Sequence, residues 1–169
     1  MSYGEQLLEQ YLRLLVSDTF QVNYRPEWLA GLELDFYYPD RRVGFEFQGD
    51  HHYAPTDYSP NYKRVRRNDV QKKRICKANG VLLLTIDAVD LEYTRLRSKI
   101  KIIRAWCRAG LDKKNVEQLR RLNKESTQYR KTLRTNFDAA TAMRRANQER
   151  KRLIAERRLP SLEKNLQTK

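Results

Sequence analysis

The sequence predicts an α/β fold, in which a mixed β-sheet of about four strands is flanked by helices and followed by a long basic helical extension. Three observations predict it. Apolar residues recur at helical spacing at the start of the chain and in two later segments. Short alternating or continuous apolar runs lie between those segments. Residues 113–158 contain neither glycine nor proline, which is typical of one uninterrupted helix.

The first predicted elements are a helix over residues 3–16 and a strand over residues 20–24. Ser2 followed by Glu5 is a capping-box pattern. The apolar residues that follow have helical spacing and form one buried face; they are Leu7, Leu8, Tyr11, Leu14 and Leu15. Residues 20–24 alternate apolar and polar side chains, as a half-buried strand does.

The next predicted element is an antiparallel hairpin over residues 32–48, with a turn at residues 39–42. In its first strand, Leu34 and Phe36 share one face and Asp35 lies on the other. In the return strand, Glu46 and Gln48 share the polar face. The hairpin therefore has one apolar and one acidic face, and Asp35 and Glu46 can converge on the acidic one.

The second half of the predicted core alternates helix, strand and helix. A helix over residues 63–79 is ended by Gly80. Residues 81–86 form a nearly continuous apolar run, which indicates a strand covered on both faces. A further helix is expected within residues 87–111. The pattern predicts a core at residues 1–110 and a basic helical extension at residues 111–169.

The extension carries a narrow apolar stripe among its arginines and lysines, formed by Tyr129, Leu133, Phe137, Ala140 and Met143. Such a helix can dock on its own domain, pair with a second copy to form a homodimer, or lie along nucleic acid. The sequence does not rank these three alternatives.

The charge of the chain indicates a polyanionic partner. Lys and Arg number 35 against 21 Asp and Glu, so the formal net charge is +14, and the surplus is concentrated in residues 111–169. We expect DNA as the partner, with RNA an open alternative. The polar N-terminus lacks the apolar stretch of a signal peptide, and no apolar run is long enough to span a membrane. A cytoplasmic or nucleoid-associated protein that is not secreted is expected.

Asp35 and Glu46 are the candidate metal ligands. Phosphodiester hydrolysis uses a metal to polarise the phosphate and to lower the pKa of water. Hard cations such as Mg²⁺ or Mn²⁺ prefer oxygen ligands, and Mg²⁺ is commonly held by one or two carboxylates. The alternative interpretation is that both acids lie on a solvent-exposed face of the sheet, where acids are common.

Further polar residues cluster around this pair in the sequence. Gln48 follows Glu46 on the same strand face and could orient a water, and His52 could act as a general base or stabilise the leaving oxygen. In the next helix, Asp69 and Lys72 fall on one stripe with Val65 and Cys76. If that stripe faces the sheet, both charges are buried, and buried charges need partners.

These residues together resemble the PD-(D/E)XK nuclease superfamily. The runs Leu34–Pro39, Phe45–His52 and Asp69–Lys72 look closest to the branch of very-short-patch repair endonucleases and related homing endonucleases, which is described by an EDxHD motif. The resemblance covers roughly residues 2–90. It implies a restriction-endonuclease-like core, a metal-dependent DNA endonuclease activity, and Glu5, Asp35, His52 and Asp69 as the four motif residues.

The chain departs from the superfamily pattern at one position. The lysine expected two residues after the glutamate is Gln48 here. Either Gln48 orients the water, or Lys72 or Lys73 supplies the positive charge from the helix. The role of Glu46, as a direct metal ligand or as a support for one, depends on that choice.

Nucleic-acid contacts are predicted beside the site. Basic residues there would contact phosphates and tyrosines would stack on bases; the predicted set is Lys63, Arg64, Arg66, Arg67, Tyr53 and Tyr58. The predicted function is a divalent-metal-dependent endonuclease that cuts or nicks structured or branched DNA. The alternatives are a catalytically inactive nucleic-acid-binding protein on a nuclease scaffold, or an assembly protein that uses its basic helix.

Overall fold

A computed structural model of the chain describes residues 1–16, 18–49, 62–100 and 113–166. The chain divides into two compact units, Met1–Arg130 and Lys131–Lys169. The first unit contains the sheet and all the candidate site residues that are described. Its first helix begins at the predicted capping box, in which Ser2 Oγ accepts from the Glu5 amide and Glu5 Oε2 accepts from the Ser2 amide.

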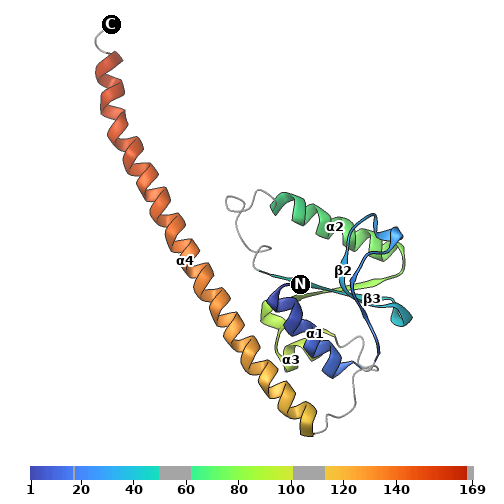
Figure 1. The fold of residues 1–169 in the computed structure, drawn as a ribbon. Helices are drawn as coiled ribbons and strands as arrows, with labels where there is room; N and C mark the ends of the chain where they lie inside the picture. Colours follow the sequence, from blue (N-terminus) through green and yellow to red (C-terminus); the bar gives the residue numbers. More distant parts are fainter. Residues whose placement is uncertain (17, 50–61, 101–112, 167–169) are drawn as a thin grey trace. The chain divides into compact units, whose positions relative to one another are not determined.

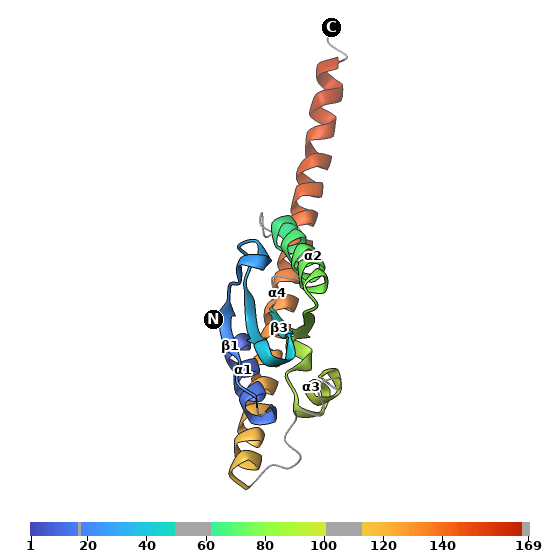
Figure 2. The same ribbon diagram turned by 90° about the vertical axis from the view of Figure 1, so that its right-hand side faces the viewer.

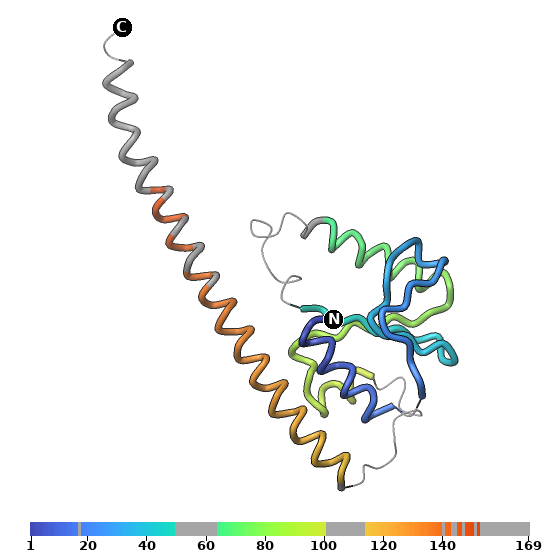
Figure 3. Tube along the Cα trace, in the orientation of Figure 1, coloured from blue at the N-terminus to red at the C-terminus, as the bar shows by residue number. Residues whose placement is uncertain are grey.

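The observed order of elements confirms the predicted one of helix, three strands, helix, strand and helix (Figure 1 and Figure 3). The helices and strands are α1 (Tyr3–Leu15), β1 (Gln21–Tyr24), β2 (Leu34–Tyr38), β3 (Val43–Gln48), α2 (Tyr62–Ala78), β4 (Leu82–Asp87), α3 (Tyr93–Lys99) and α4 (Lys113–Leu166). Gly80 follows α2 with a φ of 65°, a conformation that glycine adopts without strain.

The four strands form one mixed sheet, as predicted, and their order in it is β1-β2-β3-β4. The hairpin β2–β3 is antiparallel, with Phe36 opposite Phe45 and Tyr37 opposite Gly44. Strands β3 and β4 are parallel, with α2 between them in the sequence. A parallel pair requires such a crossover connection.

Helices cover both faces of this sheet (Figure 1 and Figure 2). On one face, α1, α3 and the first turns of α4 pack on the strands, and this cluster includes Leu8, Phe36, Phe45 and Leu122. On the other face, Cys76 of α2 packs with Leu34, Tyr37 and other residues of a smaller cluster. The side of α2 that carries Lys72 and Cys76 therefore faces the sheet, as its stripe predicts.

Residues 81–86 have apolar contacts on both faces of the sheet, as predicted, with Leu84 and Ile86 in one cluster and Val81 and Leu83 in the other, but the strand lies at the edge of the sheet. Among the described residues β4 has a neighbouring strand on one side only, and most of its side chains are half-buried. Leu82 is 38% exposed. A run of leucines indicates a strand but does not place it in the centre of a sheet, because packing partners elsewhere in the chain decide that position.

The predicted alternation of β2 was wrong at Leu34. Leu34 packs in the cluster with Cys76, whereas Phe36 packs in the cluster on the opposite face. The break coincides with Asn23 of β1, which has a φ of 51° and lies opposite Asp35 in the β1–β2 register. Asparagine tolerates that left-handed conformation better than most residues do.

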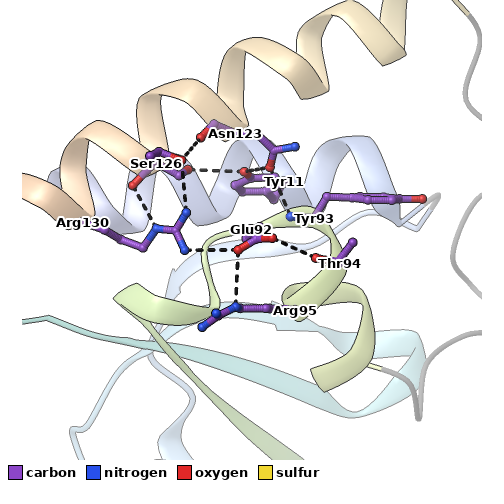
Figure 4. A network of polar contacts seen from close by, with 9 residues as sticks. Tyr11, Glu92, Tyr93, Thr94, Arg95, Asn123, Ser126 and Arg130 are labelled. Atoms are coloured by element: carbon purple, nitrogen blue, oxygen red, sulfur yellow. Dashed lines mark hydrogen bonds and ion pairs between the residues drawn. The ribbon is translucent and has the colours of Figure 1, made fainter.

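The first turns of α4 belong to the first compact unit. Leu119 and Leu122 are buried there. Asn123 Oδ1 accepts from the Tyr11 hydroxyl at 2.6 Å and from the Tyr93 amide at 3.2 Å (Figure 4). Arg130 Nη1 lies 3.3 Å from Glu92 Oε2 in the same network. These contacts join α1, α3 and the first turns of α4, so the start of the predicted extension docks on its own domain, one of the three alternatives that the sequence left open.

In the second unit, α4 continues as a largely exposed helix wherever its side chains are described. Of the predicted apolar stripe, Phe137 is 52% exposed, whereas Tyr129 packs edge-on against Tyr3 within the first unit. The side chains of Ala140 and Met143 lie outside the described ones. No helix in the described ranges has the length and apolar character needed to cross a membrane.

Candidate active site

Asp35 and Glu46 lie next to each other on β2 and β3. The hairpin register pairs Phe36 with Phe45, and its continuation places Asp35 opposite Glu46. The regular ladder ends there, because Asp35 Oδ2 accepts the hydrogen bond of the Phe47 amide at 2.7 Å. The Asp35 carboxylate thus replaces a carbonyl of the strand ladder as the acceptor for a backbone amide. This hydrogen bond fixes the Asp35 side chain beside Glu46.

Burial dominates the electrostatics of Asp35. Desolvation raises the pKa of Asp35 to about 6, and the hydrogen bond from the Phe47 amide partly opposes that rise. The negative charge of Glu5 raises the pKa further, and the positive charge of Lys72 lowers it. Asp35 therefore takes up a proton more readily than a solvated aspartate does.

Glu46 is held by Lys72 of α2. Lys72 Nζ lies 2.6 Å from Glu46 Oε2, and the two side chains are only 12% and 14% exposed. Desolvation and then the charge of Asp35 raise the pKa of Glu46 to about 8, against the opposing effects of Lys72 and the Asp35 amide. Its second oxygen, Oε1, is buried and has no hydrogen-bond partner among the described residues.

One lysine serves two carboxylates at this position. With both acids ionised, the group of Asp35, Glu46 and Lys72 carries one uncompensated negative charge in a poorly hydrated place. A buried charge without a partner costs several kcal/mol, so the group gains from either a proton or an added cation. Desolvation is the largest cause of the raised pKa values of Asp35 and Glu46, and for Glu46 the charge of Asp35 adds to it.

A small surface depression opens beside Glu46, between α2 and the edge strand β4. It is lined by Glu46, Gln48, Asp69, Lys72, Lys73, Leu83 and Thr85. The structure thus places five predicted or alternative site residues around one opening. Of the three groups considered for the missing lysine, Lys72 contacts Glu46, whereas Lys73 is exposed at the rim.

Glu5 lies at the margin of this site. Its Oε2 caps α1 by accepting from the Ser2 amide, and its charge raises the pKa of Asp35. A close packing contact fixes the start of α1 against the strand of Glu46: a Cβ at Gly4 would lie 2.2 Å from the Phe47 ring. Only glycine permits that approach.

Several predicted residues lie outside the described ones. His52, Tyr53 and Tyr58 belong to residues 50–61, and the side chain of Lys63 is likewise not described. The roles assigned to these four residues stay predictions. Arg64, Arg66 and Arg67 are described and exposed on α2.

Three polar residues near the site were missed by the sequence reasoning. Thr85 pairs with Glu46 in the β3–β4 register, and Asp87 pairs with Gln48. Asp87 Oδ1 is buried without a hydrogen-bond partner among the described residues. The signal for Thr85 was its place as the one polar residue in an apolar run. Nothing in the sequence marked Asn23 as the residue opposite Asp35.

The donor set at Asp35 and Glu46 fits a hard divalent cation. Two adjacent carboxylates supply oxygen ligands, and the buried Glu46 Oε1 lacks a partner within the described chain. No larger cluster stands there: within residues 1–16, 18–49, 62–100 and 113–166, no three His, Cys, Asp or Glu side chains gather closely enough to hold a metal. Mg²⁺ commonly uses one or two carboxylates and keeps several waters, so two suffice.

Comparisons with known proteins give one partial likeness. No protein-family model matches the chain, and no solved structure matches it. The chain is similar to Uncharacterized protein 033L of Invertebrate iridescent virus 3, with 32% identity over 106 residues. The match spans 51% of this chain and 55% of the viral protein, so the chain covers just over half the length of that relative.

Proposed function

We propose that the protein is a divalent-metal-dependent endonuclease that hydrolyses phosphodiester bonds in DNA, on a restriction-endonuclease-like core. The observation that carries the proposal is the half-buried pair of Asp35 and Glu46, whose combined charge exceeds that of Lys72. The buried Oε1 atom of Glu46 has no hydrogen-bond partner among the described residues. Two carboxylates held close together beneath a helix repel each other, which costs free energy unless a cation binds to them.

Each residue of the site has a proposed role. Asp35 and Glu46 would hold Mg²⁺ or Mn²⁺, which when bound polarises the phosphate and makes water a stronger acid. Lys72 holds Glu46 Oε2 in place and brings a positive charge to the opening, where it can contact a phosphate oxygen. Gln48 and Asp69 line the same opening and can orient a water by hydrogen bonds. His52 is the proposed general base or acid.

The remaining parts of the chain would hold the substrate. Phosphate contacts from Lys63, Arg64, Arg66 and Arg67, with stacking by Tyr53 and Tyr58, would position DNA at the site. The basic helix α4 beyond residue 130 would add affinity or join two copies into a homodimer. We assign the protein to the cytoplasm or the nucleoid as part of the same proposal.

The test is nicking of supercoiled plasmid in the presence of Mg²⁺ or Mn²⁺ by the wild type and by Asp35→Asn. The substitution keeps an oxygen that can accept from the Phe47 amide but removes the charge that a metal needs. We expect at least about a hundredfold slower nicking, the range of a lost electrostatic contribution to catalysis. Asp40→Asn, in the exposed turn of the same hairpin, is the matched control and should nick as the wild type does.

Equal nicking by Asp35→Asn and the wild type would reject this site as the catalytic centre. Binding of plasmid without nicking, in both metals and at every pH between about 6 and 9, would reject the enzyme. It would favour the alternative of an inactive nucleic-acid-binding protein on the same scaffold.

A further inference from the structure

The outer surface of α2 carries a row of positive charge. Five of the six described basic side chains of α2 that are exposed form this row, and we call this set the α2 basic face: Arg66, Arg67, Lys73, Arg74 and Lys77. Their spacing repeats at seven and eleven residues, so they lie on the side of the helix opposite Lys72 and Cys76, which face the sheet. The face runs from Arg66 to Lys77 of α2 (Tyr62–Ala78) rather than only over its first turns.

Three exposed arginines elsewhere in the first unit differ from these residues. Arg13, Arg25 and Arg41 each form an ion pair, with Glu9, Glu33 and Asp18. None of the five residues of the α2 basic face forms an ion pair with a described residue. The one acid of α2, Asp69, lies instead in the depression beside Glu46. Five like charges on one helix repel one another, and a polyanion would relieve that repulsion.

The dimensions of the face suit a phosphate backbone. Arg66 and Lys77 are eleven residues apart, which is about 16 Å along a helix, a length over which one strand of a duplex presents about five phosphates. Lys73 belongs both to the face and to the rim of the depression that contains Glu46. The row of charge therefore passes the opening of the candidate active site and continues beyond it in both directions along α2.

The chemistry of the face favours duplex nucleic acid over two other polyanions. Val70, 65% exposed, is the one large apolar side chain exposed on the described part of α2, whereas a helix that binds a lipid surface needs a wide apolar face. Binding to single strands relies on aromatic side chains, and the described side chains of the face include none.

We propose that the α2 basic face is a contact surface for the phosphate backbone of duplex DNA, reaching from Arg66 to Lys77. We infer binding at this surface from the charge and the exposure of its five side chains alone. The further step, that the bound strand is the one cut at Glu46, rests on the proposed function. Phosphate contacts of this kind position a duplex without reading its sequence.

The test compares two triple variants of the full chain, each lowering the net charge by the same amount. The first, Arg66→Gln, Lys73→Gln and Lys77→Gln, removes part of the α2 basic face. The second, Arg13→Gln, Arg25→Gln and Arg41→Gln, removes three exposed cations that are already paired. Binding to a fluorescent duplex of about 30 base pairs is measured without divalent metal at several salt concentrations, so cleavage does not enter.

We expect the first variant to lose at least about tenfold in affinity, and its slope of log K against log salt to become shallower by about 2.7, the value for three lost phosphate contacts. The second variant should stay within about twofold of the wild type. Equal losses in both variants would overturn the proposal, because only net charge would then matter. Tighter binding to single strands or to anionic vesicles than to duplex would overturn it as well.

A measurement on the wild-type protein does not depend on whether the variants fold. Duplex should slow acetylation of Lys73 and Lys77 in the wild type, while Lys124, exposed on α4, serves as the comparison within the first unit. Equal acetylation of Lys73 with and without duplex would contradict the surface. If the α2 basic face is needed for binding but no plasmid is nicked with Mg²⁺ or Mn²⁺, the proposed function fails and this surface stands. If plasmid is still nicked after the α2 basic face has been removed, the proposed function stands and this surface fails.

Discussion

At the scale of single residues, proton binding and stability are coupled at Glu46. Its pKa in the folded protein, about 8, lies above the ordinary 4.5, so the folded state binds the proton more tightly than the unfolded state does. The contribution of Glu46 to stability is therefore fully present below about pH 4.5 and is lost as the pH rises toward 8. Asp35 has a pKa of about 6, so its contribution to stability is likewise lost as the pH rises from about 4 to 6.

Two substitutions of Asp35 should have opposite effects on stability at pH 8 without divalent metal. Asp35→Asn removes the charge that raises the pKa of Glu46 and keeps an acceptor for the Phe47 amide, so we expect about 1 kcal/mol of added stability. Asp35→Ala leaves that amide without an acceptor and should cost about 1–3 kcal/mol. Urea unfolding followed by circular dichroism measures both, and equal stabilities of the two variants would refute the role of the Phe47 hydrogen bond.

Lys72→Gln should destabilise the protein in a pH-dependent way. Lys72 lowers the pKa of Glu46, so its removal raises that pKa further and leaves the ionised carboxylate without its partner. The loss should be small near pH 4, where Glu46 is protonated in both states, and reach about 3 kcal/mol at pH 9. Unfolding free energies at both pH values test this, with Lys73→Gln at the exposed rim as the control. A loss independent of pH would contradict the electrostatic explanation.

Part of this site could be predicted from the sequence because strand alternation is a local property. It placed Asp35 and Glu46 on neighbouring strands, and helical periodicity placed Lys72 toward the sheet. The hydrogen bond between Asp35 and the Phe47 amide could not be predicted, because it depends on where the β2–β3 ladder ends. The displacement of Leu34 from the face of Phe36 could not be predicted either, because it depends on the packing of Leu34 in the cluster with Cys76 of α2.

At the scale of elements, the contact between α1 and β3 is tight enough to forbid a side chain. Gly4→Ala would place a methyl group 2.2 Å from a carbon of the Phe47 ring, so the ring or the helix must move. We expect a loss of about 1–3 kcal/mol although alanine favours helices more than glycine does. Thermal unfolding measures the loss. Gln6→Ala, exposed on the same helix, is the control and should not destabilise; a stable Gly4→Ala would show that the contact relaxes freely.

The arrangement of the elements was predictable only in order and type. Periodicity and turn residues predict each helix and strand separately, and the order α1 to α3 follows from them. The edge position of β4 and the packing of residues 113–130 on the core depend on contacts between distant segments. Tyr11 and Asn123 are 112 residues apart in sequence, and no local pattern connects them.

At the scale of the whole molecule, the boundary between the two compact units predicts where the chain can be shortened. Residues 1–130 should fold, because Leu119, Leu122 and Asn123 stay in place on the core. Residues 1–112 should be less stable by at least about 4 kcal/mol, since two buried leucines and the Asn123 hydrogen bonds are lost. Cooperative unfolding followed by circular dichroism tests the pair, and equal stability would contradict the assignment of residues 113–130 to the first unit.

The same truncation tests the function of the second unit. If the helix beyond residue 130 adds phosphate contacts, residues 1–130 should bind duplex DNA more weakly and with a shallower salt dependence than the full chain. Fluorescence anisotropy at several salt concentrations measures this difference. Unchanged affinity would restrict DNA binding to the first unit.

The position of Asn123 has a consequence for synthesis of the chain. Its side chain oxygen accepts hydrogen bonds from both the Tyr11 hydroxyl and the Tyr93 amide, so this polar link between α1 and α3 forms only after residue 123 has been added. At ordinary translation rates, that residue follows α1 by on the order of 10 s. During this interval the apolar side of α1 that later contacts α4 lacks its final cover. The speed of translation, and the chaperones that reach the nascent chain in that time, would therefore influence how much of the protein becomes correctly folded.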